Sequence, residues 1–368
     1  MEFIPLAKPE IRDEDINAAV AVLQSGMLVH GKSASELELN LSKFLGVSDT
    51  ALVSNGTASL HLALIILGIG KDDEVIVPAF SFVATANVVE LVGAKPVFCD
   101  INLETFNIDV SKIESLITPK TKAIIPVHEF GLSCDIISIM NIAQKHKLFV
   151  IEDAACALGA KQNHYFAGTL GHFGSFSFHP RKAITSGEGG ALVSNDSNLI
   201  NEVKVLRNHG IEMKDGKMNF IKAGFNYRIT DMQAALLVGQ LNRLNEIIKI
   251  RNLIAEKYLT EIKNPLFILP SVPTNYLHTW QTFHMILPSK NARNEVMEKL
   301  NKEGIGSNYG AQCIPDTDYY SNKYGYNCSV LFPNALRANE TGLAIPLYHN
   351  LTENEVAKIC SVLNKICL

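Results

Sequence analysis

A lysine in a turn of small residues is the group in this sequence best placed to do covalent chemistry. Lys182 ends the segment Phe173-Gly-Ser-Phe-Ser-Phe-His-Pro-Arg-Lys182, and the flexible run Gly187-Glu-Gly-Gly190 follows it. Alternating Phe and Ser favour a strand, which Pro180 would end, so Lys182 is expected just past a sheet. An amine that forms an imine needs such a partly desolvated position, where it is easily neutral. Most lysines in turns are solvated surface residues, so this feature alone does not define a site.

A carboxylate at the end of a buried strand is the second candidate. The apolar run Leu148-Phe-Val-Ile151 leads directly into Glu152-Asp153. Ligands of open α/β sheets bind at the carboxyl ends of strands, so Asp153 could pair there with a cationic ring nitrogen and keep it protonated. The alternative is that Asp153 only caps the next segment.

A third segment, Ser54-Asn-Gly-Thr-Ala58, lies between a predicted strand and a predicted helix. Glycine and small hydroxyl residues at a helix N-terminus leave backbone N–H groups free to bind an anion. The segment is not a Walker A loop, because no Gly-Lys-Ser/Thr follows, and it lacks the Gly-x-Gly-x-x-Gly pattern. Alone it is also compatible with an ordinary strand–helix turn, as is a fourth segment, Gly224-Phe-Asn-Tyr-Arg228.

Together these segments match the requirements of one cofactor. Pyridoxal phosphate needs an amine for its aldehyde, a carboxylate for its pyridine nitrogen, a helix N-terminus for its phosphate and an aromatic side chain for its ring face. Lys182, Asp153, Gly56–Ala58 and Phe82 could supply these four groups. We therefore predict a pyridoxal-phosphate site.

The elements around these residues alternate between apolar runs and helical patterns. Helices are predicted for 57–67 and 84–92, and buried strands for 51–54, 74–78, 96–99, 123–127, 148–152, 173–178 and 190–194. Continuous apolar runs separated by helices favour parallel strands that are covered on both faces. The predicted fold class is therefore α/β.

The pattern changes near Thr230. Thr230-Asp-Met-Gln233 fits a capping box, and a helical pattern of about thirty residues follows, toward Ile262. Beyond it we expect a strand at 281–287, a helix at 294–303 and a last helix that begins with the capping box Thr352-Glu-Asn-Glu355. We place a domain boundary near residue 245, between a large domain of residues 1–245 and a small C-terminal domain of residues 246–368.

Composition excludes several classes of function. The 368 residues are 47% hydrophobic and 19% charged, with a net charge of −4 and no long single-sign run, which argues against nucleic-acid binding. The apolar stretch 60–70 is interrupted by His61 and is far shorter than the roughly 20 residues that cross a bilayer. We expect no membrane partner.

The seven cysteines are scattered and form no Cys-x-x-Cys pair, and the histidines show no ligand spacing, so no metal site is predicted. The sequence begins Met-Glu-Phe-Ile-Pro, without the pattern of a signal peptide. A cytoplasmic location is therefore expected.

Over nearly its whole length the chain resembles the DegT/StrS family of pyridoxal-phosphate-dependent sugar-nucleotide aminotransferases. The most specific stretches are Ile151-Glu-Asp-Ala-Ala155, Ser175-Phe-Ser-Phe-His-Pro180 through Lys182 to Gly190, and Phe225-Asn-Tyr-Arg-Ile-Thr-Asp-Met-Gln-Ala-Ala235. The resemblance implies the fold-type I aminotransferase fold, with a large, mostly parallel sheet domain and a smaller C-terminal α+β lobe.

The resemblance also implies roles by position. Lys182 would form the imine and carry the proton, Asp153 would pair with the pyridine nitrogen, and Phe82 would stack on the ring. Gly56, Thr57, Ala58 and Ser177 would hold the phosphate. Cys156 stands at the position that usually contacts the phenolic oxygen, where a thiol could donate weakly, a water could replace it, or the cysteine could be only a small buried residue. The asparagine that matches Asn226 reaches the phosphate of the neighbouring subunit in this family, which implies a homodimer with shared active sites.

The implied activity is transfer of an amino group from L-glutamate to a keto sugar. The acceptor expected from the resemblance is a nucleotide-linked keto-deoxy sugar, used for surface polysaccharide or related amino-sugar biosynthesis. Such a reaction predicts ping-pong kinetics, because the donor leaves before the acceptor reacts.

The chain departs from the family pattern at three places, of which the first concerns the cofactor and the other two concern the acceptor. Cys156 stands where Gln or His is common, Glu129 stands where many members have an apolar residue, and Asn308-Tyr-Gly-Ala-Gln-Cys-Ile-Pro315 replaces a segment that often contains histidine. An acceptor without a nucleotide, such as a cyclitol ketone or a sugar-acid aldehyde, is therefore an alternative. Two others are a sugar dehydratase, whose known relatives replace the lysine by histidine, and a non-catalytic relative that binds the cofactor.

Overall fold

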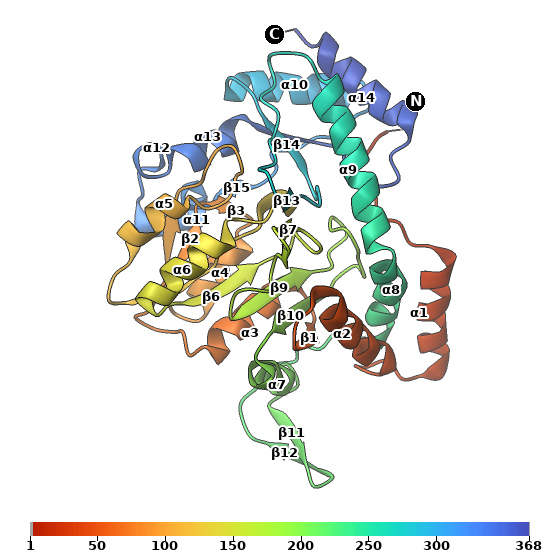
Figure 1. Cartoon of the computed structure of the whole chain (residues 1–368), viewed down its shortest axis with the longest axis vertical. Coiled ribbons are helices and arrows are strands. Elements are labelled where there is room, and N and C mark those ends of the chain that lie inside the picture. The colour runs from red at the N-terminus through yellow and green to blue at the C-terminus, as the bar shows by residue number, and fades with distance from the viewer. Residues whose placement is uncertain (1–2, 368) are drawn as a thin grey trace.

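A seven-stranded sheet forms the centre of the larger part of the molecule (Figure 1). The computed structural model describes residues 3–367. The order of the strands is β1-β10-β9-β6-β5-β2-β4, and β10 alone runs antiparallel to its neighbours. The strands are β1 (Asp49–Val53), β2 (Glu74–Pro78), β4 (Lys95–Cys99), β5 (Thr121–Ile124), β6 (Phe149–Asp153), β9 (Phe173–Ser177) and β10 (Gly190–Ser194).

All seven strands occur where apolar runs predict them, and the mostly parallel sheet is confirmed. The exception, β10, follows β9 in the chain and pairs with it directly, so the chain reverses its direction between these two neighbouring strands. The connections from β1 to β2, β2 to β4, β4 to β5 and β5 to β6 carry helices, whereas the parallel strands β6 and β9 are joined through the small hairpin of residues 161–166.

Alternate residues of the strands face two different helical layers. On one face Val53, Val77 and Leu192 belong to the same core as residues of α3, α4 and α7. On the other face Leu52 and Val193 pack with α2 and α8, and other strand residues pack with α6. The sheet is therefore buried on both sides, which explains its nearly continuous apolar strands.

The helices predicted at 57–67, 84–92, 294–303 and after Thr352 are found close to those positions, among others that were not predicted. The helices are α1 (Asp13–Ser25), α2 (Lys32–Leu45), α3 (Gly56–Ile66), α4 (Ala84–Leu91), α5 (Val110–Ile113), α6 (Ile136–His146), α7 (Ser197–Leu206), α8 (Asp231–Asn242), α9 (Leu244–Glu261), α10 (Lys290–Lys302), α11 (Asp318–Tyr324), α12 (Cys328–Leu331), α13 (Pro333–Thr341) and α14 (Glu353–Lys365). Both predicted capping boxes form, with Thr230 before α8 and Thr352 before α14.

The prediction of a single long helix after Thr230 is wrong in one respect. The helix is interrupted at Arg243, which separates α8 from α9. The guanidinium of Arg243 forms ion pairs with Asp15 and Glu14 of α1, at 2.7 and 2.8 Å. Asp15 and Glu14 lie more than 200 residues away in sequence, so the helical pattern around Arg243 does not reveal this contact.

A second core lies in the C-terminal part of the chain. It gathers residues of α9, α10 and α14 around the antiparallel pair β14 (Phe283–Ile286) and β16 (Gly342–Ile345). Ile4 also belongs to this core and forms a bridge to Ile305. Part of the C-terminal chain packs on the first core, including Tyr320 of α11 and Phe332. The boundary near residue 245 stays a prediction.

The remaining strands are short and belong to small sheets. They are β3 (Phe80–Ser81), β7 (Lys161–Gln162), β8 (Tyr165–Phe166), β11 (Ile211–Lys214), β12 (Lys217–Phe220), β13 (Tyr276–Leu277) and β15 (Gln312–Cys313). The hairpin of β11 and β12 projects away from the body (Figure 1). Within residues 3–367, every helix is too short or too polar to span a bilayer.

Candidate active site

A cavity of about 750 Å³ lies at the carboxyl-terminal ends of β1, β2, β5, β6 and β9. Parallel strands bring these ends to one edge of the sheet, where α/β proteins bind their ligands. Eight of the nine residues predicted for the cofactor line this cavity: Gly56, Thr57, Ala58, Phe82, Asp153, Cys156, Ser177 and Lys182. The ninth, Asn226, is exposed and is not among the residues of this chain that line it.

One end of the cavity is the N-terminus of α3. The Asn55 side chain accepts a hydrogen bond from the Ala58 N–H at 2.8 Å and so caps the helix. The N–H groups of Gly56 and Thr57 belong to the first turn, which has no partners inside the helix. A Cβ on Gly56 would lie 3.0 Å from the Cβ of Ser177, so glycine lets the helix approach the end of β9. Backbone N–H groups and a hydroxyl therefore meet where an anion could bind.

Gly190 packs directly against the backbone of this anion-binding turn, and we expect replacement of Gly190 to weaken anion binding there. A Cβ at position 190 would lie 2.5 Å from the Asn55 carbonyl carbon and 2.8 Å from the Gly56 nitrogen. Gly190→Ala should push the turn outward, weaken pyridoxal-phosphate binding at least tenfold and lower stability by about 1–3 kcal/mol. Absorbance titration and thermal unfolding measure the two effects. Gly70→Ala, whose Cβ meets only one atom, at 3.5 Å, is the control, and equal cofactor affinity in the two variants would contradict the expectation.

Asp153 ends β6 and is almost completely buried. Its carboxylate accepts hydrogen bonds from Thr85 Oγ1 at 2.8 Å and from the Ala155 N–H at 3.2 Å. Burial raises its pKa, and the two hydrogen bonds together with the Lys182 charge oppose that shift. Sequence reasoning missed the contribution of Thr85, although a hydroxyl in the first turn of a helix after a strand was a usable signal.

Lys182 lies in the turn after β9, as predicted, and its amine faces Cys156 at 3.0 Å from Nζ to Sγ. The turn is fixed by Gln240 of α8, whose side chain accepts from the Thr185 N–H and donates to the Thr185 carbonyl, at 2.9 and 2.8 Å. Burial raises the pKa of the Cys156 thiol, and the charge of Lys182 opposes that shift.

Phe82 lies on the cavity wall with 65% of its surface exposed. An aromatic face left open inside a cavity is suited to stacking on a planar ring. The lining of the cavity also includes the polar residues Glu129, Gln281, Thr282 and Gln312. Gln312 comes from the C-terminal part of the chain and reaches the site because β15 pairs with β3, with Gln312 opposite Ser81. Sequence reasoning singled out Glu129 and the segment of Gln312 but missed Gln281 and Thr282.

The arrangement fits pyridoxal phosphate. An amine, a buried carboxylate, an open aromatic face and an anion-binding helix N-terminus surround one cavity, and these are the groups that this cofactor requires. Across residues 3–367, no three His, Cys, Asp or Glu side chains gather in a way that could hold a metal ion.

Comparisons with known proteins agree with this geometry. The sequence profile of the DegT/DnrJ/EryC1/StrS aminotransferase family matches residues 9–364. The spore coat polysaccharide biosynthesis protein SpsC of Bacillus subtilis is 35% identical over 378 residues, covering 99% of this chain and 97% of that protein.

Solved structures of sugar aminotransferases superpose on nearly the whole chain. The putative sugar aminotransferase Spr1654 of Streptococcus pneumoniae, in its PMP form, gives a TM-score of 0.94 with 28% identity over 98% of this chain and 97% of that chain. Helicobacter pylori PseC, an aminotransferase involved in the biosynthesis of pseudoaminic acid, gives 0.94 with 29% identity over 99% of both chains. A PLP form of Spr1654 matches equally well.

The fold, the cofactor groups and these similarities lead to one assignment. The resemblance noted in the sequence is confirmed over 9–364, together with the aminotransferase fold and the cofactor that it implied. The chain belongs to the DegT/DnrJ/EryC1/StrS aminotransferase family and is a pyridoxal-phosphate-dependent sugar aminotransferase.

Proposed function

We propose that this aminotransferase moves the amino group of L-glutamate to a nucleotide-linked keto-deoxy sugar. The observation that carries the proposal is the cavity in which Lys182, Asp153 and the N-terminus of α3 come together, lined also by the polar residues Glu129, Thr282 and Gln312. One side of the cavity suits the cofactor phosphate, and the other leaves room for a hydroxylated acceptor.

Each residue of the cavity has a proposed task. When bound, pyridoxal phosphate supplies an aldehyde that holds the amino group and a ring that stabilises negative charge on the carbon that loses its proton. The Lys182 amine acts first as a base that takes a proton from the donor α-carbon. It then acts as an acid that delivers the proton to C4′ of the cofactor. Asp153 holds the proton of the ring nitrogen, and Phe82 orients the ring. Gly56, Thr57, Ala58 and Ser177 bind the phosphate.

The biosynthetic roles for which two relatives are named support the proposed acceptor. SpsC is a spore coat polysaccharide biosynthesis protein, and PseC takes part in the biosynthesis of pseudoaminic acid. We propose by this similarity that the product is an amino sugar for a surface polysaccharide or a related amino-sugar pathway. A cytoplasmic location fits an enzyme whose substrates are nucleotide-linked sugars and glutamate.

We also propose that the enzyme is a homodimer in which each active site receives Asn226 from the partner subunit. Support comes from the projecting hairpin of β11 and β12, which leads back toward Asn226. Its apolar side chains Met213, Met218 and Phe220 are 57–70% exposed. A group of exposed apolar side chains of this kind is typical of a surface that contacts another protein.

Charges placed on this hairpin should separate the subunits. The double variant Met213→Asp with Phe220→Asp is expected to shift the protein from dimer to monomer in light scattering. The reason is that burying the two new carboxylates in the interface would cost their hydration. Cofactor binding should weaken at the same time if Asn226 acts in trans. Leu253→Asp, at another exposed apolar position, is the control. A dimer that persists in the double variant would refute this interface.

The test of the proposed donor is spectroscopic. Purified protein incubated with pyridoxal phosphate should develop a yellow absorbance band that L-glutamate bleaches, with release of 2-oxoglutarate. Initial rates with glutamate and a keto sugar should give the parallel lines of ping-pong kinetics. A requirement for both substrates in one complex would contradict the proposal, as would bleaching by other amino acids but not by glutamate.

A further inference from the structure

Glu129 is a buried acidic side chain with unused hydrogen-bonding capacity in the wall of the active site. It is 5% exposed and lines the cofactor cavity together with Lys182 and Asp153. In the part of the chain that the structure describes, its Oε2 atom has no hydrogen-bond partner. Burying such an atom without a partner costs free energy, so a native site that contains one is a candidate for binding a ligand group.

The backbone around Glu129 is built to hold it in place. Its N–H donates to the Asn107 side chain at 2.8 Å. The next residue, Phe130, has φ +55°, a left-handed conformation that is unfavourable for a bulky side chain. Strained backbone of this kind persists where the surrounding structure over-determines it, and it gathers at functional sites. The carboxyl group is therefore held in a fixed position, and Ser81 forms a hydrogen bond to it.

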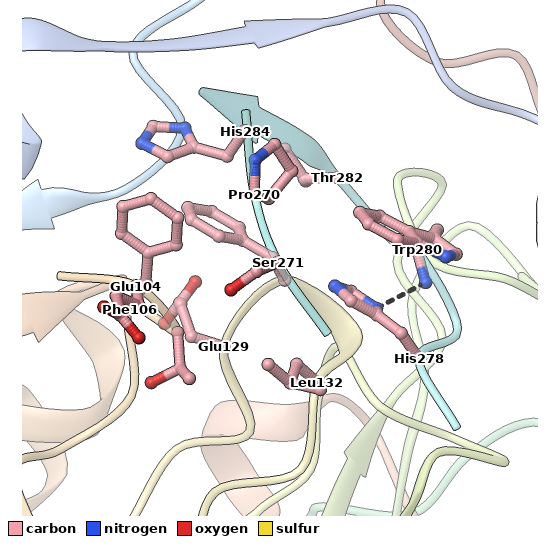
Figure 2. Close-up of a pocket in the computed structure, with 12 residues that line it drawn as sticks. Glu104, Phe106, Glu129, Leu132, Pro270, Ser271, His278, Trp280, Thr282 and His284 are labelled. Atoms are coloured by element: carbon pink, nitrogen blue, oxygen red, sulfur yellow. Dashed lines mark hydrogen bonds between the residues drawn. The ribbon is translucent and has the colours of Figure 1, made fainter. Parts of the chain in front are cut away.

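Glu129 lines the cofactor cavity and also a smaller pocket, and Phe130 and Thr282 line both as well. Figure 2 shows the smaller pocket, with Glu129, Thr282 and His284 among its lining residues. On the far side of that pocket the buried ring of His284 stacks on Phe130, with centroids 4.5 Å apart. Burial lowers the pKa of His284 to about 3, so this ring is neutral and gives Glu129 no cationic partner. Because Glu129 also lines the cofactor cavity, a ligand bound there can supply a partner for the carboxyl group.

The electrostatic surroundings define which partner fits. Burial raises the pKa of Glu129 to about 7, with the hydrogen bond from Ser81 and the charge of Lys182 opposing the shift and Asp153 adding to it. Both protonation states are therefore populated near neutral pH. A hydroxyl group suits either state, because it donates to a carboxylate and accepts from a carboxylic acid. An anionic ligand group would meet repulsion from Glu129 and Asp153.

We propose that Glu129 is a specificity-determining residue that hydrogen-bonds a hydroxyl group beside the acceptor carbonyl. This proposal rests on the proposed function, since it assumes a sugar ketone as acceptor. It narrows the substrate class to a sugar with an uncharged hydroxylated ring and disfavours a sugar-acid aldehyde whose carboxylate would face this wall. Gln312 lines the same cavity, as do Gln281 and Thr282, which hydrogen-bond to each other at 2.9 Å.

The test uses protein loaded with pyridoxamine 5′-phosphate, which bypasses the donor. The probes are thymidine- and uridine-diphosphate-linked 4-keto-6-deoxyglucose and the corresponding 4-keto-3,6-dideoxy sugars, which lack the hydroxyl beside the carbonyl. The return of the yellow band gives the rate of amination. Binding of the unreactive 6-deoxyglucose nucleotides, followed by calorimetry, gives a readout that is independent of turnover.

Glu129→Leu is expected to lower kcat/KM for the hydroxylated ketone about 10- to 100-fold and to leave the rate for the deoxy sugar within about threefold. Binding of the unreactive hydroxylated nucleotide should weaken by a similar factor. Glu129→Gln keeps the shape and one acceptor oxygen and should preserve most of the preference for the hydroxylated sugar. Glu104→Gln, at an exposed position beside the smaller pocket, should behave as wild type.

Three results would overturn the proposal. If Glu129→Leu lowered kcat/KM equally for the hydroxylated and the deoxy sugar, the residue would act on folding or on the cofactor. An unchanged preference would mean that it does not contact the hydroxyl. A loaded wild-type protein that aminates neither probe would refute the proposed acceptor class, and the role of Glu129 would fall with it. A failure with L-glutamate alone would refute only the donor.

Discussion

Lys182→Ala should abolish transamination, with activity at least about 1,000-fold below that of the wild type. Among the described residues that line the cavity, Lys182 is the only lysine, and its amine can form an imine with an aldehyde and move a proton; it lies 3.0 Å from Cys156. The variant should still bind pyridoxal phosphate through the N-terminus of α3, but its spectrum should be that of the free aldehyde. Absorbance spectra and steady-state rates measure the two expectations.

The effect should be specific to this lysine. Lys145→Ala removes an amine that lies at the surface, 2.7 Å from Glu114, and should leave both the spectrum and the rates unchanged. Added methylamine should restore part of the lost activity of Lys182→Ala, because a small amine can enter the space that the side chain leaves. Normal turnover by Lys182→Ala would show that another group moves the proton.

Asp153→Asn should lower kcat about 100- to 1,000-fold while leaving the fold intact. The carboxylate at the end of β6 is the buried anion expected to keep the ring nitrogen protonated, and an amide cannot hold that charge. Asparagine has nearly the same volume and can still bond to Thr85 and to the Ala155 N–H, so the unfolding temperature should change little. Single-turnover rates with L-glutamate and thermal unfolding measure the two quantities.

Thr85→Val is the matched variant for Asp153→Asn. It removes the 2.8 Å hydrogen bond to Asp153 but leaves the charge, so its effect on kcat should be about tenfold or less. A loss as large as that of Asp153→Asn would mean that the position of the carboxylate matters more than its charge. Wild-type rates in Asp153→Asn would exclude the pairing with the ring nitrogen.

The sequence by itself determined the larger sheet and most of the cofactor site. The strands are runs of apolar residues, and the start of α8 and of α14 is marked by a capping box, so both signals are local. Lys182, Asp153 and Gly56 each follow or end a strand, and parallel strands bring such positions to one edge without further information. Chemistry that is placed at strand ends is therefore readable from the sequence.

Only the tertiary structure decided the features that depend on contacts between distant segments. Gln312 reaches the cavity by pairing with Ser81, and the helix after Thr230 is interrupted where Arg243 meets Asp15. The unpaired oxygen of Glu129 is likewise defined by the side chains packed around it. These contacts join residues that are up to about 230 positions apart, and their geometry depends on packing of the whole chain, which no local pattern of residue types encodes.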